Sequence, residues 1–261
     1  MGGTGERPGG AGGRWARFPG TGHGHSGREA RIARVPAERS GLREPAREGH
    51  AMRIGIIGAG HIGSALAQHF TRVGYDVAVS NSRGPETLRD LVAELGPRAR
   101  ALTVEETARF GDVVVVSIPF GRYHELPSAS LSRKIVIDTC NYFPERDGHD
   151  PDLDQDRITS SQKIRAHTGA NVVKAFNAVY WENLRAGSRP KGAPDRIAVP
   201  ISGSDEDAKA VVAGLIRDIG FDPVDAGNLG QGGRRHQPGT RVFGAKMTAE
   251  EMSGLFHAVQ R

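Results

Sequence analysis

Residues 53–63 read RIGIIGAGHIG, and this stretch decides the fold. Its first five residues form a short apolar run, which is typical of a buried parallel strand. Residues 58–63 follow as G-x-G-x-x-G. Apolar residues then recur at helical spacing as far as Val73, and Tyr75–Ser80 is expected to form a second strand. A strand, a glycine turn, a helix and a strand within about 30 residues predict a dinucleotide-binding unit.

Each glycine of the motif has a separate physical task. Gly58 permits the tight turn out of the strand, and Gly60 has no Cβ, so a pyrophosphate can approach its backbone. Gly63 lets the helix pack closely against the strand. The helix N-terminus offers free N–H groups and a partial positive charge to the phosphates. The alternative is a glycine turn that holds no ligand.

The end of the second strand indicates which cofactor binds. An NAD-preferring site places Asp or Glu there, to accept a hydrogen bond from the ribose 2′-hydroxyl. This chain has Ser80-Asn81-Ser82-Arg83 instead. An Arg can clamp a 2′-phosphate and a Ser hydroxyl can donate to it, so we predict NADP(H), held by Ser82 and Arg83. The alternative is a surface arginine in an ordinary turn.

The rest of the chain alternates between strand and helix patterns, which predicts an α/β fold with a doubly wound, mostly parallel sheet of the Rossmann type. A second βαβ-like unit at the sheet edge and a small C-terminal extension complete it. The further strands are expected at 99–103, 112–118, 134–138, 171–175, 196–203 and 221–224, and the helices at 88–95, 104–110, 205–219 and 248–259. The expected domains are residues 52–229, which bind NADP, and residues 230–261, a loop and a helix.

Ligands of such sheets bind beyond the carboxyl ends of the strands. This geometry selects three loops, 117–120, 138–141 and 176–177. In the first loop, Ser117, Ile118 and Pro119 are predicted to flank a nicotinamide, with an apolar wall against one face of its ring. Asn141 or Asn177 could bond the carboxamide, although each is also an ordinary turn residue.

Other residues in or near these loops admit two interpretations. Cys140 is a potential nucleophile, but without a partner pattern it is expected to be a small buried side chain. Lys174 is either an acid or a chain end that reaches water. His236 is a candidate proton donor or a merely exposed histidine, and Arg234 and Arg235 either bind an anionic substrate or are solvated. We assign no catalytic side chain and no metal ligand.

Composition bounds the remaining possibilities. A single Cys excludes a disulfide framework, and no apolar run has the roughly 18 residues of a membrane span. Residues 1–51 carry 9 Arg, 5 Glu and 13 Gly, whereas the rest of the chain carries 26 basic and 25 acidic residues. We therefore expect residues 1–51 to be a disordered Gly/Arg-rich segment, either a solvated extension or sequence upstream of a start at Met52 that is not translated, with nucleic-acid binding as the alternative. The protein is expected to be cytoplasmic, with no nucleic-acid or membrane partner.

The stretches MRIGIIGAGHIGSALA, SNSRGPETL, VVVVSIPF, VVKAFN and ISGSDEDAK…VDAG, which span residues 52–229, resemble the coenzyme F420-dependent NADP oxidoreductase family. The Ser-Arg pair after the second strand, the SIP loop and the KAFN strand carry most of this resemblance. It implies reversible hydride transfer between NADPH and the deazaflavin F420. It also implies that the backbone around Ala59, Gly60, His61 and Ile62 binds the phosphates. Ala175 would lie at the far wall of the nicotinamide pocket.

Hydride transfer needs no protein nucleophile, because the protein only orients two flat rings and excludes water. A small-molecule redox substrate is therefore expected, and a homodimer is an open possibility. Two other functions remain. One is an NADP-dependent reductase of a small imine or 2-hydroxy acid, although only 35 residues follow Ala226, too few for a large helical substrate domain. The other is an NADP-binding sensor without enzymatic activity.

Overall fold

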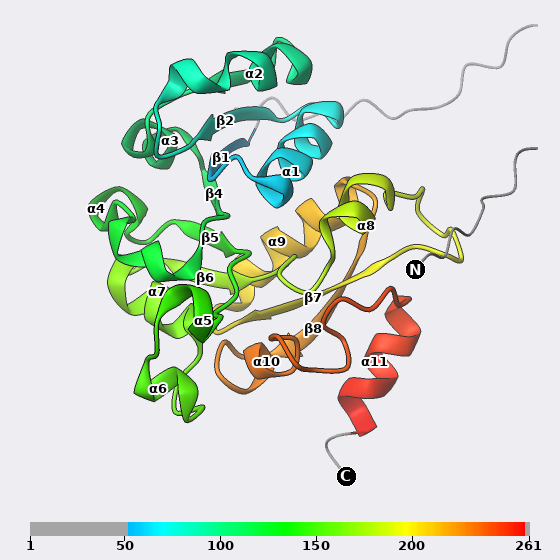
Figure 1. The fold of residues 1–261 in the computed structure, drawn as a ribbon. Helices are drawn as coiled ribbons and strands as arrows, with labels where there is room; N and C mark the ends of the chain where they lie inside the picture. Colours follow the sequence, from blue (N-terminus) through cyan, green and yellow to red (C-terminus); the bar gives the residue numbers. More distant parts are fainter. Residues whose placement is uncertain (1–51, 259–261) are drawn as a thin grey trace, which may run out of the picture. The chain divides into compact units, whose positions relative to one another are not determined.

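The computed structural model describes residues 52–258 (Figure 1). The extension expected at residues 1–51 and the last three residues lie outside the described part. Within it, eight strands form one sheet in the order β3-β2-β1-β4-β5-β6-β7-β8. The strands are β1 (Arg53–Ile57), β2 (Asp76–Ser80), β3 (Ala99–Ala101), β4 (Val113–Val116), β5 (Ile135–Asp138), β6 (Asn171–Lys174), β7 (Ala198–Gly203) and β8 (Asp222–Gly227).

All neighbouring strands are parallel except β6 and β7, which pair antiparallel. The helices are α1 (His61–Arg72), α2 (Arg89–Leu95), α3 (Val104–Phe110), α4 (Ser128–Leu131), α5 (Pro144–Asp147), α6 (Pro151–Asp154), α7 (Ser160–Thr168), α8 (Trp181–Ala186), α9 (Glu206–Asp218), α10 (Gln231–Arg234) and α11 (Ala249–Ala258), with 3₁₀ turns at Pro85–Leu88 and Phe120–Glu125. The predicted Rossmann-type α/β fold is thus confirmed.

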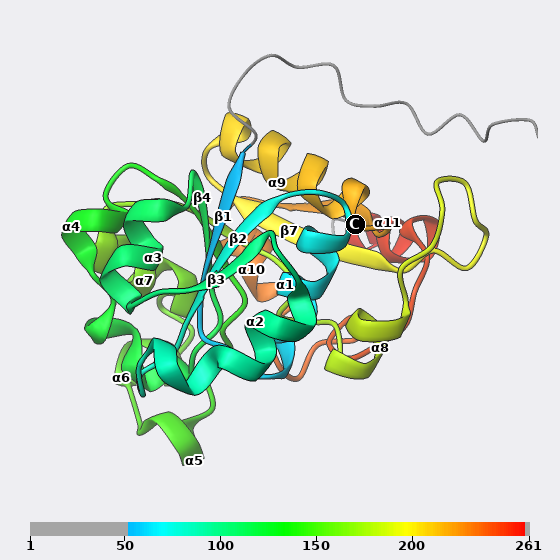
Figure 2. The same ribbon diagram turned by 90° about the horizontal axis from the view of Figure 1, so that it is seen from above.

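Helices cover both faces of the sheet. Successive strand residues point to opposite sides, so a strand of apolar residues has side chains to bury on each face. In β4, Val113 and Val115 pack into an apolar cluster that includes side chains of α1, α8 and α9. Val114 and Val116 pack into a second cluster with side chains of α3, α4 and α7, which lie together in Figure 2. Four buried valines in a row therefore report a strand that is covered on both faces, as the sequence predicts.

The edge unit also forms as predicted. Asp205 caps α9, since its side chain accepts a hydrogen bond from the Ala208 N–H. This helix connects β7 to β8, and the two strands pair in parallel. Beyond β8, α11 packs its Met252 and Phe256 against the face of the edge strands opposite to α9. The sequence pattern did not predict α4, α5, α6, α7, α8 or α10, each of which has nine residues or fewer.

Candidate functional site

The glycine turn between β1 and α1 is built from close backbone contacts. Gly58 has φ +108°, a left-handed conformation that favours glycine, and a Cβ there would collide with the Ser117 carbonyl. A Cβ on Gly63 would collide with the Gly58 carbonyl. Both glycines are therefore needed by the fold itself, with or without a ligand.

Gly60 differs, because nothing in the protein requires it to lack a side chain. It caps α1 with an extended backbone (φ −78°), and a Cβ built on it has no atom within 4 Å. The first turn of α1 carries no acidic residue that would occupy the free N–H groups. An open, uncharged helix N-terminus beside an unobstructed backbone fits a pyrophosphate group.

The turn after β2 is shaped by Asn81. Its Oδ1 accepts hydrogen bonds from the backbone N–H groups of Arg83 and Gly84, at 2.9 and 3.0 Å. Ser82 and Arg83 are both exposed on this turn. The Ser82 hydroxyl lies 3.4 Å from an Nη1 donor of Arg122, a residue of the 3₁₀ turn after β4.

Two cavities flank the glycine turn. The first, which we name the Ser82 cavity, has a volume of about 230 Å³ and lies at the carboxyl ends of β1, β2 and β4. Its apolar walls come from Val104, Ile118 and Leu126, and its polar groups from Asn81, Ser82 and the 3₁₀ turn. An apolar slot beside exposed polar groups at these strand ends matches the adenosine end of a dinucleotide.

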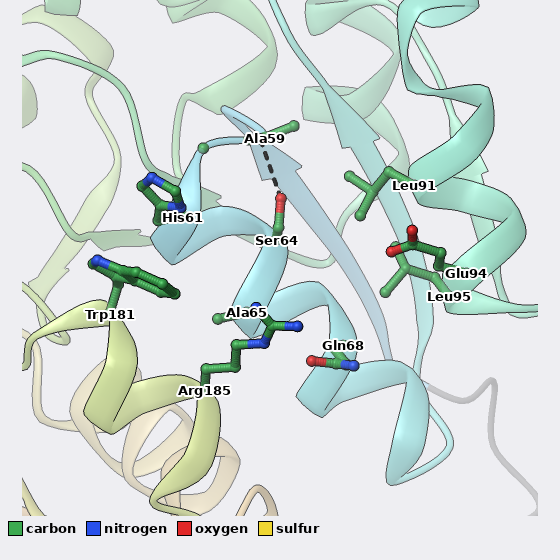
Figure 3. Close-up of a pocket in the computed structure, with 11 residues that line it drawn as sticks. Ala59, His61, Ser64, Ala65, Gln68, Leu91, Glu94, Leu95, Trp181 and Arg185 are labelled. Carbon is green, nitrogen blue, oxygen red and sulfur yellow. Dashed lines mark hydrogen bonds between the residues drawn. The ribbon is translucent and has the colours of Figure 1, made fainter. Parts of the chain in front are cut away.

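The second cavity, which we name the Trp181 cavity, has a volume of about 370 Å³ and is bounded by α1, α2 and α8 (Figure 3). The rings of His61 and Trp181 stack at its edge, with centroids 4.6 Å apart and planes inclined by 20°. Figure 3 shows Arg185 reaching from α8 over Ala65 of α1. This groove begins at the glycine turn and runs along α1, away from the Ser82 cavity.

The structure brings most of the predicted site residues to these two cavities. The Ser82 cavity is lined by Gly58, Gly60, Ser82, Ser117, Ile118 and Pro119, and the Trp181 cavity by Ala59, Gly60 and His61. The residues that line neither are Ile62, Gly63, Arg83, Asn141 and Ala175. Ala175 has no exposed surface and belongs to the core, so a ligand would reach its side chain only if neighbouring groups moved.

At the carboxyl ends of β5 and β6, Asn141 and Asn177 form a pair. Asn141 donates from Nδ2 to the Asn177 carbonyl at 2.9 Å, and Asn177 donates from Nδ2 to Asn141 Oδ1 at 3.0 Å. The second N–H of the Asn177 amide goes to the His236 carbonyl at 2.8 Å. Phe176, directly before Asn177, has φ +62°, which is rare and strained for a bulky residue. The surrounding structure thus fixes the orientation of Asn177.

His236 is buried, contrary to the prediction that favoured an exposed loop histidine. Its Nδ1 donates to Asn177 Oδ1 at 2.8 Å, and its Nε2 accepts from the Ser202 hydroxyl at 2.6 Å. Burial, with a smaller contribution from the charge of Lys174, lowers the pKa of His236 to about 3. The ring is therefore neutral near pH 7 and does not act there as the proton donor that the sequence left open.

The other ambiguous residues are also explained by internal contacts. Cys140 is buried as predicted, and burial raises the pKa of its thiol well above the usual value. Lys174 is buried rather than reaching water, and its Nζ donates to the Cys140 carbonyl and the Ser161 hydroxyl at 2.9 and 3.1 Å. Arg234 donates to the Asp156 carbonyl, and Arg235 lies over the Phe256 ring and donates to a carbonyl of β8. These arginines anchor the tail.

Sequence reasoning missed three features of this region: the Arg122 side chain, the Trp181 ring and the pairing of His236 with Ser202. Arg122 follows the predicted SIP loop by three residues, so its place at a strand end was a usable signal. The other two contacts join residues that lie far apart in the chain, and no local pattern reports them. Between residues 52 and 258, no cluster of three or more His, Cys, Asp or Glu is arranged to hold a metal. Nor does any helix there combine the length and apolar character that crossing a bilayer requires.

The fold and the glycine turn define a class, the dinucleotide-binding proteins with a Rossmann-type sheet. Residues 53–142 match the family "NADP oxidoreductase coenzyme F420-dependent". A hypothetical protein from Sinorhizobium meliloti, SMa0349, is 31% identical, and the alignment covers 76% of this chain and 95% of that one with a TM-score of 0.67. A protein of Arthrobacter sp. FB24 to which an F420-dependent NADP-reductase activity is attributed is 24% identical, with 76% and 100% coverage and a TM-score of 0.61.

Among curated proteins, the rat metalloreductase STEAP3 is 29% identical over 186 residues, which are 69% of this chain. The chain spans about a third of the length of that relative, 34%. The chain belongs to the F420-dependent NADP oxidoreductase family.

Proposed function

We propose that the protein transfers hydride between NADPH and a deazaflavin of the F420 type. The observation that carries the proposal is the Ser82 cavity, which joins the glycine turn, the Ser82 turn and the SIP loop in one site at the strand ends. The family match supports the choice of acceptor. NADPH supplies the hydride when it is bound, and the protein supplies binding, orientation and exclusion of water.

Each part of the cofactor would be bound by a different group of the predicted residues. The backbone of Ala59 to Ile62 and the open side of Gly60 would hold the pyrophosphate. Ser82 and Arg83 would hold the 2′-phosphate, because a hydroxyl and a guanidinium both donate to phosphate oxygens. Ile118 and Pro119 lie on the side of the Ser82 cavity nearest Gly58, where they would separate the adenosine from the nicotinamide and cover one face of the nicotinamide ring.

The Asn pair would orient the nicotinamide. Both N–H groups of Asn177 are used inside the protein, whereas only one N–H of the Asn141 amide has a hydrogen-bond partner among residues 52–258. Asn141 is therefore the better candidate to bond the carboxamide. With His236 neutral and enclosed, the proton that a reduced deazaflavin carries would come from solvent or from backbone N–H groups rather than from this side chain.

The test is anaerobic oxidation of NADPH, followed by its absorbance, against a panel of acceptors: F420, riboflavin, a quinone, a ferric chelate and a cyclic imine. The expected result is turnover with F420 that exceeds turnover with every other acceptor, and a much slower reaction with NADH. Tight binding of NADPH without turnover by any acceptor would indicate a sensor and refute the proposal. Turnover with the ferric chelate alone would refute the deazaflavin and place the activity nearer to that of the metalloreductase relative.

A further inference from the structure

The Ser82 cavity contains an ion pair that the predicted cofactor site does not use. Arg122 donates from Nε and Nη2 to the two carboxylate oxygens of Glu125, at 2.8 and 2.6 Å. Both residues line the cavity, and their side chains are 47% and 48% exposed. The bidentate hydrogen bonds raise the pKa of Arg122 and lower that of Glu125, so both groups are charged at neutral pH.

The orientation of the guanidinium is informative. The edge with Nε and Nη2 faces Glu125, while Nη1 points back toward Ser82 and lies 3.4 Å from its hydroxyl. An arginine carries five N–H donors, so the donors on the Ser82 side remain available to an anion. Two phosphate-binding groups from different strand ends therefore converge at one point of the cavity, the hydroxyl after β2 and the guanidinium after β4.

We propose that Arg122 determines specificity for NADP(H) by binding the 2′-phosphate beside Ser82, and that Glu125 competes with this phosphate for the guanidinium. The inference rests on the proposed placement of the adenosine in the Ser82 cavity. An exposed ion pair contributes little stability, so giving up part of it for a phosphate that carries between one and two negative charges is favourable. Glu125 in turn repels the phosphate and keeps the affinity below its maximum.

The probes are 2′,5′-ADP and 5′-AMP, which differ only in the 2′-phosphate of the ribose, with titration calorimetry as the measurement. For Arg122→Ala we expect the dissociation constant of 2′,5′-ADP to rise roughly ten- to a hundredfold, the range for a lost charge-assisted contact, while that of 5′-AMP is unchanged. Arg122→Lys keeps the charge without the planar fork and should retain part of the preference for 2′,5′-ADP. Glu125→Gln should bind 2′,5′-ADP about two- to fivefold more tightly than the wild type.

The matched control is the pair Arg157–Asp152, which joins at 3.1 Å, is similarly exposed at 61% and 48%, and lines neither cavity. Arg157→Ala should bind both probes as the wild type does. An Arg122→Ala variant with wild-type preference for 2′,5′-ADP would overturn the inference and leave the proposed function standing, and so would weaker binding of 2′,5′-ADP by Glu125→Gln. A wild-type protein that does not prefer 2′,5′-ADP over 5′-AMP would refute both.

Discussion

Gly60→Ala separates the binding role of the glycine turn from its role in folding. Gly60 already has a backbone conformation that alanine adopts, and a Cβ there meets no atom within 4 Å. Alanine restricts the unfolded chain, which stabilises by about 0.4–1 kcal/mol, but it is a poorer N-cap than glycine by a similar amount. We therefore expect the free energy of unfolding to change by less than about 0.5 kcal/mol.

The effect on binding should be much larger. The added methyl group occupies the space through which a pyrophosphate would approach the N–H groups at the start of α1. A hydrogen bond to a charged group is worth about 1.5–3 kcal/mol, so the loss of a single one weakens NADPH binding roughly ten- to a hundredfold. NADH should lose as much, because the pyrophosphate is common to both cofactors. Titration calorimetry measures the affinities, and urea denaturation measures the stability.

Two further glycines make the comparison sharp. Gly63→Ala forces α1 away from the Gly58 carbonyl, so it should lose about 1–3 kcal/mol of stability as well as affinity. Gly214→Ala in α9 is as open as Gly60 but lines neither cavity, and it should bind both cofactors normally. If Gly60→Ala binds NADPH as tightly as the wild type does, the pyrophosphate does not cross this turn and the placement of the cofactor is wrong.

The remaining predictions concern three other residues. Arg83→Ala should weaken NADPH binding by about 1.5–3 kcal/mol and leave NADH binding unchanged, and equal losses in calorimetry would contradict a role at the 2′-phosphate. His236 has a pKa of about 3 in the folded protein, below its unfolded value near 6.5, so its contribution to stability is complete above pH 6.5 and is lost as the pH falls toward 3. Between pH 6.5 and pH 3, the free energy of unfolding of the wild type should fall by up to about 4–5 kcal/mol more than that of His236→Gln. Equal losses in denaturation experiments would contradict the buried neutral ring. The thiol of Cys140 should react with a thiol reagent only as fast as the protein opens, and rapid labelling of the native protein would show that the side chain is accessible.

The elements that the sequence predicted are those with a strong local signal. The four valines of β4 predict only a strand, and the apolar stripe of α9 predicts only a helix, because the hydrophobic period and length of each segment match one type of element. The glycine turn was predictable for a different reason. Gly58 and Gly63 meet a steric demand of the strand-to-helix connection, and the structure confirms their close backbone contacts, whereas Gly60 was predicted for its approach to a ligand.

The parts that the sequence did not predict depend on contacts between distant residues. His236 lies in a Gly-rich polar stretch that looks solvated, yet it is buried because Ser202 and Asn177 satisfy both of its ring nitrogens. Arg122 and Ser82 are 40 residues apart and meet only because β2 and β4 both neighbour β1 in the sheet. Burial of a polar side chain is decided by its partners, and partners at such separations leave no periodic trace in the chain.

The hydrogen bonds at the ends of β5 and β6 decide which of two asparagines, Asn141 or Asn177, is the better candidate to bond the carboxamide. Taken singly, Asn141 and Asn177 are equal candidates for a carboxamide partner, since each sits on a loop at a strand end. In the structure the two residues are joined by hydrogen bonds, and the amide of Asn177 donates one N–H to Asn141 Oδ1 and the other to the His236 carbonyl. A ligand could recruit Asn177 only by breaking a buried hydrogen bond, which costs about 1–3 kcal/mol, whereas Asn141 is partly exposed and could donate to a ligand without that loss. His236 would therefore act on the proposed site indirectly, because its hydrogen bond holds Asn177 and Asn177 in turn holds Asn141, which we propose as the partner of the carboxamide.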